Sequence, residues 1–232
     1  MRKILIKFPT RNRPDKFKNV LEKTIKYLSG NHHIRFVITM DEDDSTMNNK
    51  KMKSYLKRIR KNGTDIVYYY GNSKTKVEAC NANLEGESAD IIVLLSDDMV
   101  PCFDAFDELI VSGMEEHFPN MDGAIKFNDG LRGNQDLLMT LPVIGWKLYE
   151  AIGHLYHPSY TSIYCDNEMT HVCMVLSKLA VSPVCLFRHD WTSQPFDELH
   201  ARNENAEMYR IDGAIFEGRK KNNFDIDKIS LT

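Results

Sequence analysis

The chain has 232 residues, 42% of them hydrophobic and 27% charged, which is enough for one sizeable core in a globular protein. Its formal net charge of −3 gives the whole molecule no electrostatic pull toward nucleic acid or anionic membranes. No apolar run approaches the roughly 20 residues of a membrane span, and the start, MRKILIKFPT, is too short for a signal peptide. The five cysteines are scattered and odd in number, which argues against a disulfide framework. We therefore expect a cytoplasmic protein with reduced thiols.

The first hundred residues alternate between apolar runs and amphipathic segments. The runs at 3–8, 34–41, 66–71 and 90–98 are predicted to be strands. Helices are predicted between them, at 13–30, at 52–63 and, as a short one, around 77–84. The strands are apolar throughout, which is typical of strands buried on both faces. This alternation predicts an α/β fold with a doubly wound, mainly parallel sheet flanked by helices.

The pattern is looser after residue 101. We predict helices at about 103–117, 141–153 and 167–180, and strands at 123–130 and 184–191. The polar segment from about 192 to 232 is expected to be a helical arm packed on the domain, or partly disordered. Because no Pro/Gly/Ser-rich linker interrupts the chain, one domain is expected over 1–232. Its parts are a nucleotide-binding half (about 1–101), a second half that completes the site (about 102–191) and the arm.

Polar residues follow each of the first strands. Ligands of open parallel sheets bind outside the carboxyl ends of the strands, and these ends carry Pro9-Thr10-Arg11, Asp41, Asn72 to Lys76, and Asp97-Asp98. Neither G-x-G-x-x-G nor a P-loop motif occurs, so phosphates require another partner. A carboxylate-bound Mg²⁺ or Mn²⁺ would serve. Consecutive side chains of an extended segment point to opposite sides, so one aspartate can bind the metal while the other accepts from a ribose hydroxyl.

Four segments in this order resemble a known family. FPTRNRP, the aspartate ending the second strand, KVEACNAN and LLSDDMVP resemble the GT-A fold (Rossmann-like) nucleotide-sugar glycosyltransferases, family 2-like. The resemblance covers residues 3–104 and continues more thinly in YCDNEM and FRHDW.

The resemblance implies a role for each matching residue. The nucleotide-sugar residues would be Pro9, Thr10 and Arg11 at the first strand end, Asp41 at the base (typically uracil), Lys76 at the base or phosphates, and Asp97 at the ribose or sugar. The metal ligands would be Asp98 and His189. The family's acidic pair is commonly Glu-Asp, whereas this chain has Asp166-Asn167-Glu168. We expect Asp166 to be the general base, with Glu168 as the alternative.

The resemblance implies a Mn²⁺- or Mg²⁺-dependent glycosyltransferase that uses a nucleotide-diphosphate sugar, typically UDP-linked. A base opposite the leaving group would invert the anomeric configuration, which we expect here, whereas a retaining enzyme would not need a base so placed. The acceptor hydroxyl stays open: a glycan, a lipid-linked glycan, a protein or a modified nucleic-acid base. The alternatives are a sugar-phosphate nucleotidyltransferase and a non-catalytic nucleotide- or glycan-binding module.

Structural readings compete with these roles. Asp97-Asp98 could form only a turn, Asp166 could be only a helix N-cap, and His189 could be a packed histidine with a carboxylate partner. The basic segment NKKMKSYLKRIRK is interpreted as the solvated face of a helix.

Overall fold

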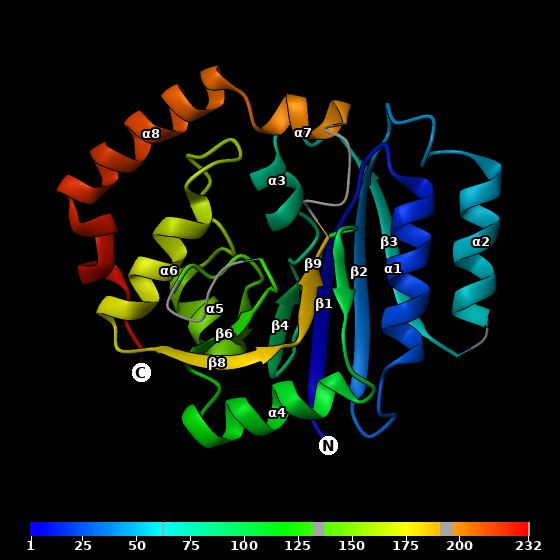
Figure 1. Ribbon diagram of the computed structural model, residues 1–232, viewed down its shortest axis with the longest axis horizontal. Helices are drawn as coiled ribbons and strands as arrows, with labels where there is room; N and C mark the ends of the chain where they lie inside the picture. The colour runs from blue at the N-terminus through cyan, green and yellow to red at the C-terminus, as the bar shows by residue number, and fades with distance from the viewer. Residues whose placement is uncertain (62, 132–136, 191–196, 232) are drawn as a thin grey trace.

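The computed structural model describes residues 1–61, 63–131, 137–190 and 197–231 (Figure 1). The strands are β1 (Lys3–Pro9), β2 (His33–Asp41), β3 (Asp65–Gly71), β4 (Ile91–Leu94), β5 (Met99–Pro101), β6 (Ala124–Asn128), β7 (Val143–Gly145), β8 (Leu179–Cys185) and β9 (Phe187–His189). The helices are α1 (Pro14–Lys26), α2 (Lys50–Lys61), α3 (Lys76–Asn81), α4 (Phe106–His117), α5 (Trp146–Ile152), α6 (Cys165–Val175), α7 (Glu198–Asn203), α8 (Ala206–Lys221) and the 3₁₀ helix η1 (Asn223–Lys228).

A seven-stranded sheet in the order β3-β2-β1-β4-β7-β6-β8 forms the centre of the molecule. β1 pairs in parallel with both β2 and β4. β2 and β3 therefore follow on one side of β1, and β4, the next strand along the chain, lies on the other side of β1. This reversal of strand order is where open α/β sheets open a crevice for ligands.

Helices cover both faces of the sheet, as predicted. Side chains alternate along a strand, so Ile4, Ile6 and Phe8 of β1 pack with α1, α2 and α4, whereas Leu5 packs on the face of α3, α5 and α6. The basic face of α2 is exposed, while Met52, Tyr55 and Leu56 fill the core, as predicted for that helix.

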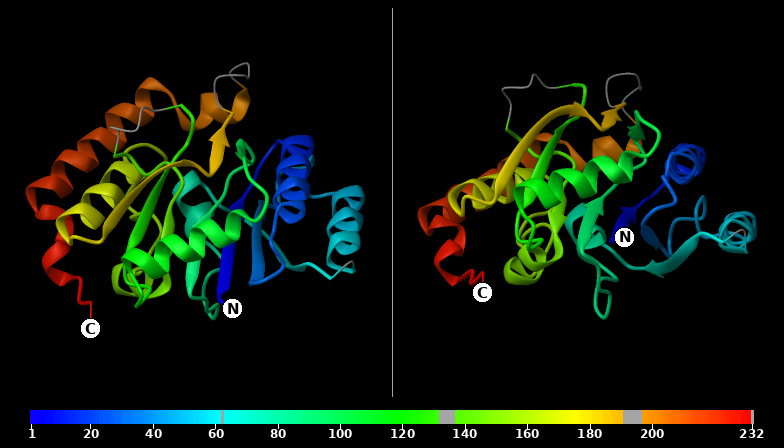
Figure 2. Two further views of the ribbon diagram at one scale, coloured as in Figure 1. Left: turned by 60° about the horizontal axis from the view of Figure 1, so that its bottom comes forward. Right: turned by 90° about the horizontal axis from the view of Figure 1, so that it is seen from below.

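The second half of the sheet is mixed. β7 runs antiparallel to both β4 and β6, and β8 forms the outer edge beside β6 before leading into β9 (Figure 2). β9 leaves this sheet and pairs with β5 in a separate two-stranded ribbon.

Four predicted segments were wrong in part. The predicted strand 184–191 is divided between the end of β8 and β9, which belong to different sheets, and its last residue, Trp191, lies outside the described residues. The predicted helix 141–153 starts as β7, and only Trp146–Ile152 is helical. Gly145 permits this strand to run tightly against the Met121 carbonyl, because a Cβ there would lie 2.3 Å from that oxygen. Residues 179–180 belong to β8 and not to the preceding helix. The predicted strand 90–98 stops at Leu94, and Asp97 and Asp98 occupy a turn before β5.

The described part of the C-terminal segment is a helical arm, so the first of the two expectations is confirmed for residues 197–231. In Figure 1, α7 and α8 run across the top of the molecule over α3 and α6. The arm is anchored by Asp212, a fully buried carboxylate of α8 that accepts hydrogen bonds from the backbone N–H groups of Thr161, Ser162 and Ile163. None of the helices in the described ranges is long and apolar enough to cross a membrane.

Candidate functional site

A cavity of about 700 Å³ opens at the carboxyl ends of β1, β2 and β4. Its walls come from strand ends, from α3, from the start of α6, from β9 and from the C-terminal arm. It is lined by nearly every residue for which a role was predicted: Pro9, Thr10, Arg11, Asp41, Lys76, Asp97, Asp98, Asp166 and His189. The structure thus brings these side chains to one place, although their individual roles stay predictions.

Asp97 faces the first strand end. Its Oδ2 accepts a hydrogen bond from the Thr10 hydroxyl at 2.9 Å, and its Oδ1 accepts one from Nη1 of Arg13 at 2.9 Å. Burial, together with the neighbouring charge of Asp98, raises the pKa of Asp97 to about 6, although Arg13 opposes this. Asp97 therefore sits among hydrogen-bond donors at the base of the cavity.

Asp98 faces the opposite way, toward β9. Its Oδ1 accepts a hydrogen bond from the Ser96 hydroxyl, and its Oδ2 lies 3.6 Å from Nε2 of His189. Burial alone would raise the pKa of Asp98, but interactions with His189 and Ser96 outweigh it and hold the pKa well below its usual range. The two adjacent aspartates lie in a turn, as the structural reading expected, and yet both are buried. Thr10 contacts Asp97 and His189 approaches Asp98, whereas Nη1 of Arg13 lies near both carboxylates.

Asp98 and His189 fit a divalent cation. Met99 and His189 are directly paired residues of the β5–β9 ribbon. Because Asp98 directly precedes Met99, this pairing keeps the Asp98 and His189 side chains close together. Two ligands at about 2.1 Å from one ion lie at most about 4.2 Å apart, so a 3.6 Å separation is compatible with shared coordination. The described residues contain no group of three or more His, Cys, Asp or Glu side chains arranged for a metal. Diphosphate oxygens and water would have to complete the shell.

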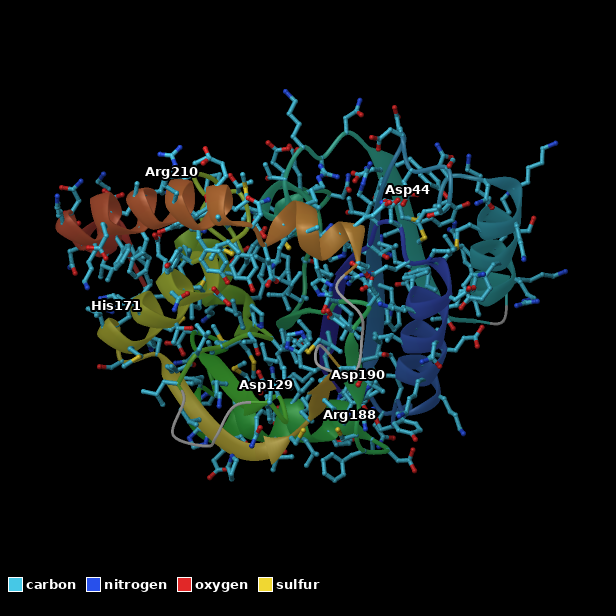
Figure 3. The ribbon with its side chains drawn as sticks, turned by 45° about the horizontal axis from the view of Figure 1, so that its top comes forward. Asp44, Asp129, His171, Arg188, Asp190 and Arg210 are labelled. Carbon is cyan, nitrogen blue, oxygen red and sulfur yellow. The ribbon has the colours of Figure 1, made fainter. Side chains whose placement is uncertain are left out.

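Arg11 and Asp41 lie together in the lining of the cavity. Nη1 of Arg11 donates to Oδ2 of Asp41 at 2.7 Å, and the same guanidinium binds the exposed Asp43. Oδ1 of Asp41 accepts from the Ser73 backbone N–H at 3.3 Å. Asp44 has a structural role instead, because it is buried and accepts from the backbone of Asn12 and Thr46 (Figure 3).

Lys76 and Asp166 begin the helices on the far wall. Lys76 is the first residue of α3, directly after the N-cap Thr75. Desolvation opposes the charged form of Lys76, but nearby acidic side chains, among them the Asp166 carboxylate, outweigh it and leave the pKa of Lys76 raised. Asp166 is not the N-cap of α6, since that position is held by Tyr164. Its carboxylate accepts a hydrogen bond from the adjacent Asn167 N–H, and Asp166 lines the cavity.

The structure places Glu168, the alternative base, outside the lining of the large cavity. Residues two apart on a helix are about 200° apart around its axis, so the two carboxylates leave α6 in opposite directions. Glu168 is 3% exposed, accepts two hydrogen bonds at 2.8 Å from Arg219, and accepts a third from the Tyr160 hydroxyl. It borders a separate cavity of about 150 Å³ between α6 and the C-terminal arm.

Sequence reasoning missed Arg13, which occupies the centre of the site. It is 8% exposed and lies 2.9 Å from Asp97 and 3.7 Å from Asp98. It also makes two hydrogen bonds of 2.8 Å to Asp197, the N-cap of α7. The sequence FPTRNRP shows a second arginine just before Pro14, which could have drawn attention to this residue. Its partner Asp197, however, lies 184 residues away in the chain.

Solved structures with a similar fold were found, whereas no protein-family model and no curated protein sequence matches the chain. A mannosyltransferase from Pyrobaculum calidifontis, PcManGT in complex with GDP-Man and Mn²⁺, aligns with a TM-score of 0.63 at 14% identity, over 86% of this chain and 59% of that one. TarS 1–349 of S. aureus in complex with UDP-GlcNAc aligns at 0.60 and 11% identity, over 83% of this chain and 62% of that one. The same TarS fragment in complex with UDP aligns with a TM-score of 0.60 at 11% identity, over 80% of this chain and 60% of that one.

These similarities confirm the predicted GT-A glycosyltransferase fold. The present chain spans about three fifths of the length of these proteins. At such low identity the likeness establishes the fold, and any activity has to be argued from the residues of this site.

Proposed function

We propose that this protein is a metal-dependent glycosyltransferase that transfers a sugar from a UDP-linked donor to an acceptor hydroxyl, with inversion at the anomeric carbon. The observation that carries the proposal is that two adjacent aspartates line one cavity and have different neighbours: Asp98 faces His189, and Asp97 faces Thr10. The cavity, about 700 Å³, lies within the size range of small-molecule sites. The fold is shared with proteins solved in complex with GDP-Man, UDP or UDP-GlcNAc.

Asp41 and Arg11 favour uracil over guanine. Uracil presents one N–H donor between two carbonyl acceptors, which suits a carboxylate beside a guanidinium. Guanine presents two adjacent donors and would engage both oxygens of Asp41, which also accept from Arg11 and Ser73. Uracil needs one acceptor site and therefore places less demand on the acceptor sites that Asp41 has left.

The chain's own residues would act on opposite sides of the sugar. A bound Mn²⁺ or Mg²⁺, held by Asp98 and His189, would supply positive charge for the departing diphosphate. Thr10 and Asp97 would orient the ribose or sugar hydroxyls. The Lys76 ammonium would add charge near the phosphates. The Asp166 carboxylate would remove the proton from the acceptor hydroxyl, and general-base catalysis of this kind contributes typically ~10²–10⁴-fold.

Calorimetry with UDP, with and without Mn²⁺, tests the donor site. We expect Mn²⁺ to strengthen UDP binding to the wild type, and Asp98→Ala to abolish that enhancement, because the ion loses its carboxylate. Glu42→Ala is the matched control, since it removes an exposed acid from the loop after β2. Tight metal-free binding that Asp98→Ala leaves unchanged would contradict the proposal.

The donor is identified by a hydrolysis screen over UDP-, GDP- and dTDP-sugars with Mg²⁺ and Mn²⁺. A glycosyltransferase slowly hydrolyses its own donor to the nucleoside diphosphate, so the acceptor need not be known. Pyrophosphate release from UTP and a sugar 1-phosphate would instead indicate a nucleotidyltransferase. Metal-enhanced binding of UDP-sugars without any turnover would indicate a binding module.

A further inference from the structure

Two of the five cysteines are next to each other in space and distant in sequence. Cys80, Cys165 and Cys173 are buried, whereas Cys102 is exposed and Cys185 is partly buried. The Sγ atoms of Cys102 and Cys185 are 3.8 Å apart, although the residues are separated by 83 positions. This contact places an accessible thiol directly against a second, shielded thiol.

The pair lies at one end of the β5–β9 ribbon. Cys102 follows β5, and its backbone N–H donates to the Leu186 carbonyl at 3.0 Å. Cys185 ends β8, where the chain leaves the seven-stranded sheet to form β9. At the other end of the same ribbon are Asp98 and His189, with Asp190 N–H donating to the Asp98 carbonyl at 2.7 Å. Figure 3 labels Arg188 of β9 and Asp190 directly after it, together with Asp129, whose carbonyl accepts from the His189 N–H.

The surroundings leave both thiols free to approach. Each thiol also makes a weak contact with a carbonyl oxygen at 3.8 Å, Cys102 Sγ with that of Val100 and Cys185 Sγ with that of Phe187. A disulfide requires an S–S distance of about 2.05 Å, so the sulfurs must approach by less than about 2 Å. Rotation about the side-chain bonds can provide much of that movement. Burial raises the pKa of Cys185 to about 11, which leaves the exposed Cys102 as the thiol that attacks first.

We propose that Cys102 and Cys185 form a reversible thiol–disulfide site that covalently closes the β5–β9 ribbon. The oxidant is a small disulfide such as glutathione disulfide. The Cys102 thiolate attacks one of its sulfurs, releasing the first glutathione thiolate and forming a mixed disulfide. The Cys185 thiolate then attacks Cys102 Sγ and releases the second glutathione thiolate. Two protein thiols are oxidised to one disulfide, one glutathione disulfide is reduced to two thiols, and the two protons leave with them or pass to solvent.

The ribbon explains why this disulfide would matter. β5 and β9 each have only three residues, so few backbone hydrogen bonds hold the strand that follows Asp98 to the strand that carries His189. A covalent bond at one end restricts sliding and opening of the pair. The inference concerns thiol chemistry and ribbon stability, and its tests do not depend on the proposed glycosyltransferase activity.

Titration with reduced and oxidised glutathione, followed by mass spectrometry of non-reduced peptides, tests the site. We expect the wild type to lose two of its five thiols and to yield one peptide pair joined through Cys102 and Cys185. The matched variant Cys185→Ser retains the exposed thiol and loses its partner, so it should stop as a stable adduct carrying one glutathione. Five remaining thiols, a persistent glutathione adduct in the wild type, or crosslinks between molecules would each overturn the proposal.

The effect on the ribbon is measured on the oxidised and reduced wild type. We expect the melting temperature to rise by roughly 4–12 °C on oxidation. We also expect slower hydrogen exchange at the Cys102 and Asp190 amides, which bond across the ribbon. Cys102→Ser should show neither change under the same oxidant. Equal melting and exchange in the two redox forms would contradict the claim that the bond closes the ribbon.

Discussion

Asp166 is the side chain on which the proposed chemistry depends most. Its carboxylate lines the large cavity, whereas the neighbouring Glu168 is held by Arg219 on the other side of α6. We predict that Asp166→Asn leaves metal-dependent UDP binding intact and lowers the rate of transfer by at least about 100-fold, because the amide cannot accept the hydroxyl proton. Binding is measured by calorimetry and transfer by product release. Glu217→Gln, on the exposed face of α8, is the control. Undiminished transfer in Asp166→Asn would rule this residue out as base.

His154 gives a prediction about pH. Burial, followed by the charges of His157 and Arg219, lowers the pKa of His154 to about 4 in the folded protein, and its Nδ1 has no hydrogen-bond partner among the described residues. The unfolded chain, with a histidine pKa near 6.5, therefore binds the proton first as pH falls. The contribution to stability is full above about pH 6.5 and is lost as pH falls toward about 4. We expect the wild type to lose more stability over this window than His154→Phe does, by urea unfolding at a series of pH values. If the free energy of unfolding changed with pH equally in the wild type and in His154→Phe, the prediction would be contradicted.

At the scale of elements, Arg13 joins the end of β1 to the start of α7. Its guanidinium is bonded to the buried Asp97 and to Asp197. Removing one partner of a buried ion pair costs about 3–5 kcal/mol; because Asp197 is 30% exposed, we expect about 3 kcal/mol for Arg13→Ala. This corresponds to a fall in melting temperature of roughly 6–12 °C.

Two further variants separate the contribution of the bidentate hydrogen bonds of Arg13 from the contribution of its positive charge. Arg13→Lys keeps the charge and loses the bidentate geometry, so we expect an intermediate loss. Arg2→Ala removes a more exposed arginine that pairs with Glu115, and we expect a change of about 1 kcal/mol or less. An Arg13→Ala protein as stable as Arg2→Ala would show that the link to α7 contributes little.

At the scale of the whole molecule, one sheet runs through both halves of the chain. β4 belongs to the first hundred residues and pairs with β7, so the two halves share a continuous row of backbone hydrogen bonds. We predict that urea unfolds them together, with far-UV circular dichroism and hydrogen exchange of β2 and β6 giving one coincident transition. Separate transitions for β2 and β6 would instead indicate two independently folding units.

The sequence by itself determined the parallel half of the sheet and the place of the site. Strand and helix periods are local, and polar residues directly after Pro9, Met40 and Leu95 fall at the carboxyl edge of any such sheet. The fold predicted from them is confirmed by the structural similarities. The cavity also contains every residue predicted for the nucleotide and the metal, although their roles remain to be tested.

Only the tertiary structure decided which long-range partners these residues have. Residues 143–145 are as apolar as a buried helix turn, and their pairing with β4 and β6 makes them a strand. Glu168 and Arg219 are 51 residues apart, Arg13 and Asp197 are 184 apart, and Cys102 and Cys185 are 83 apart. No local pattern records such pairs, because each depends on where helices and strands dock. A local sequence pattern can therefore predict that a carboxylate lies at a site or at the start of a helix. Whether that carboxylate faces a cavity, an arginine or a metal depends on the residues that surround it in the folded protein.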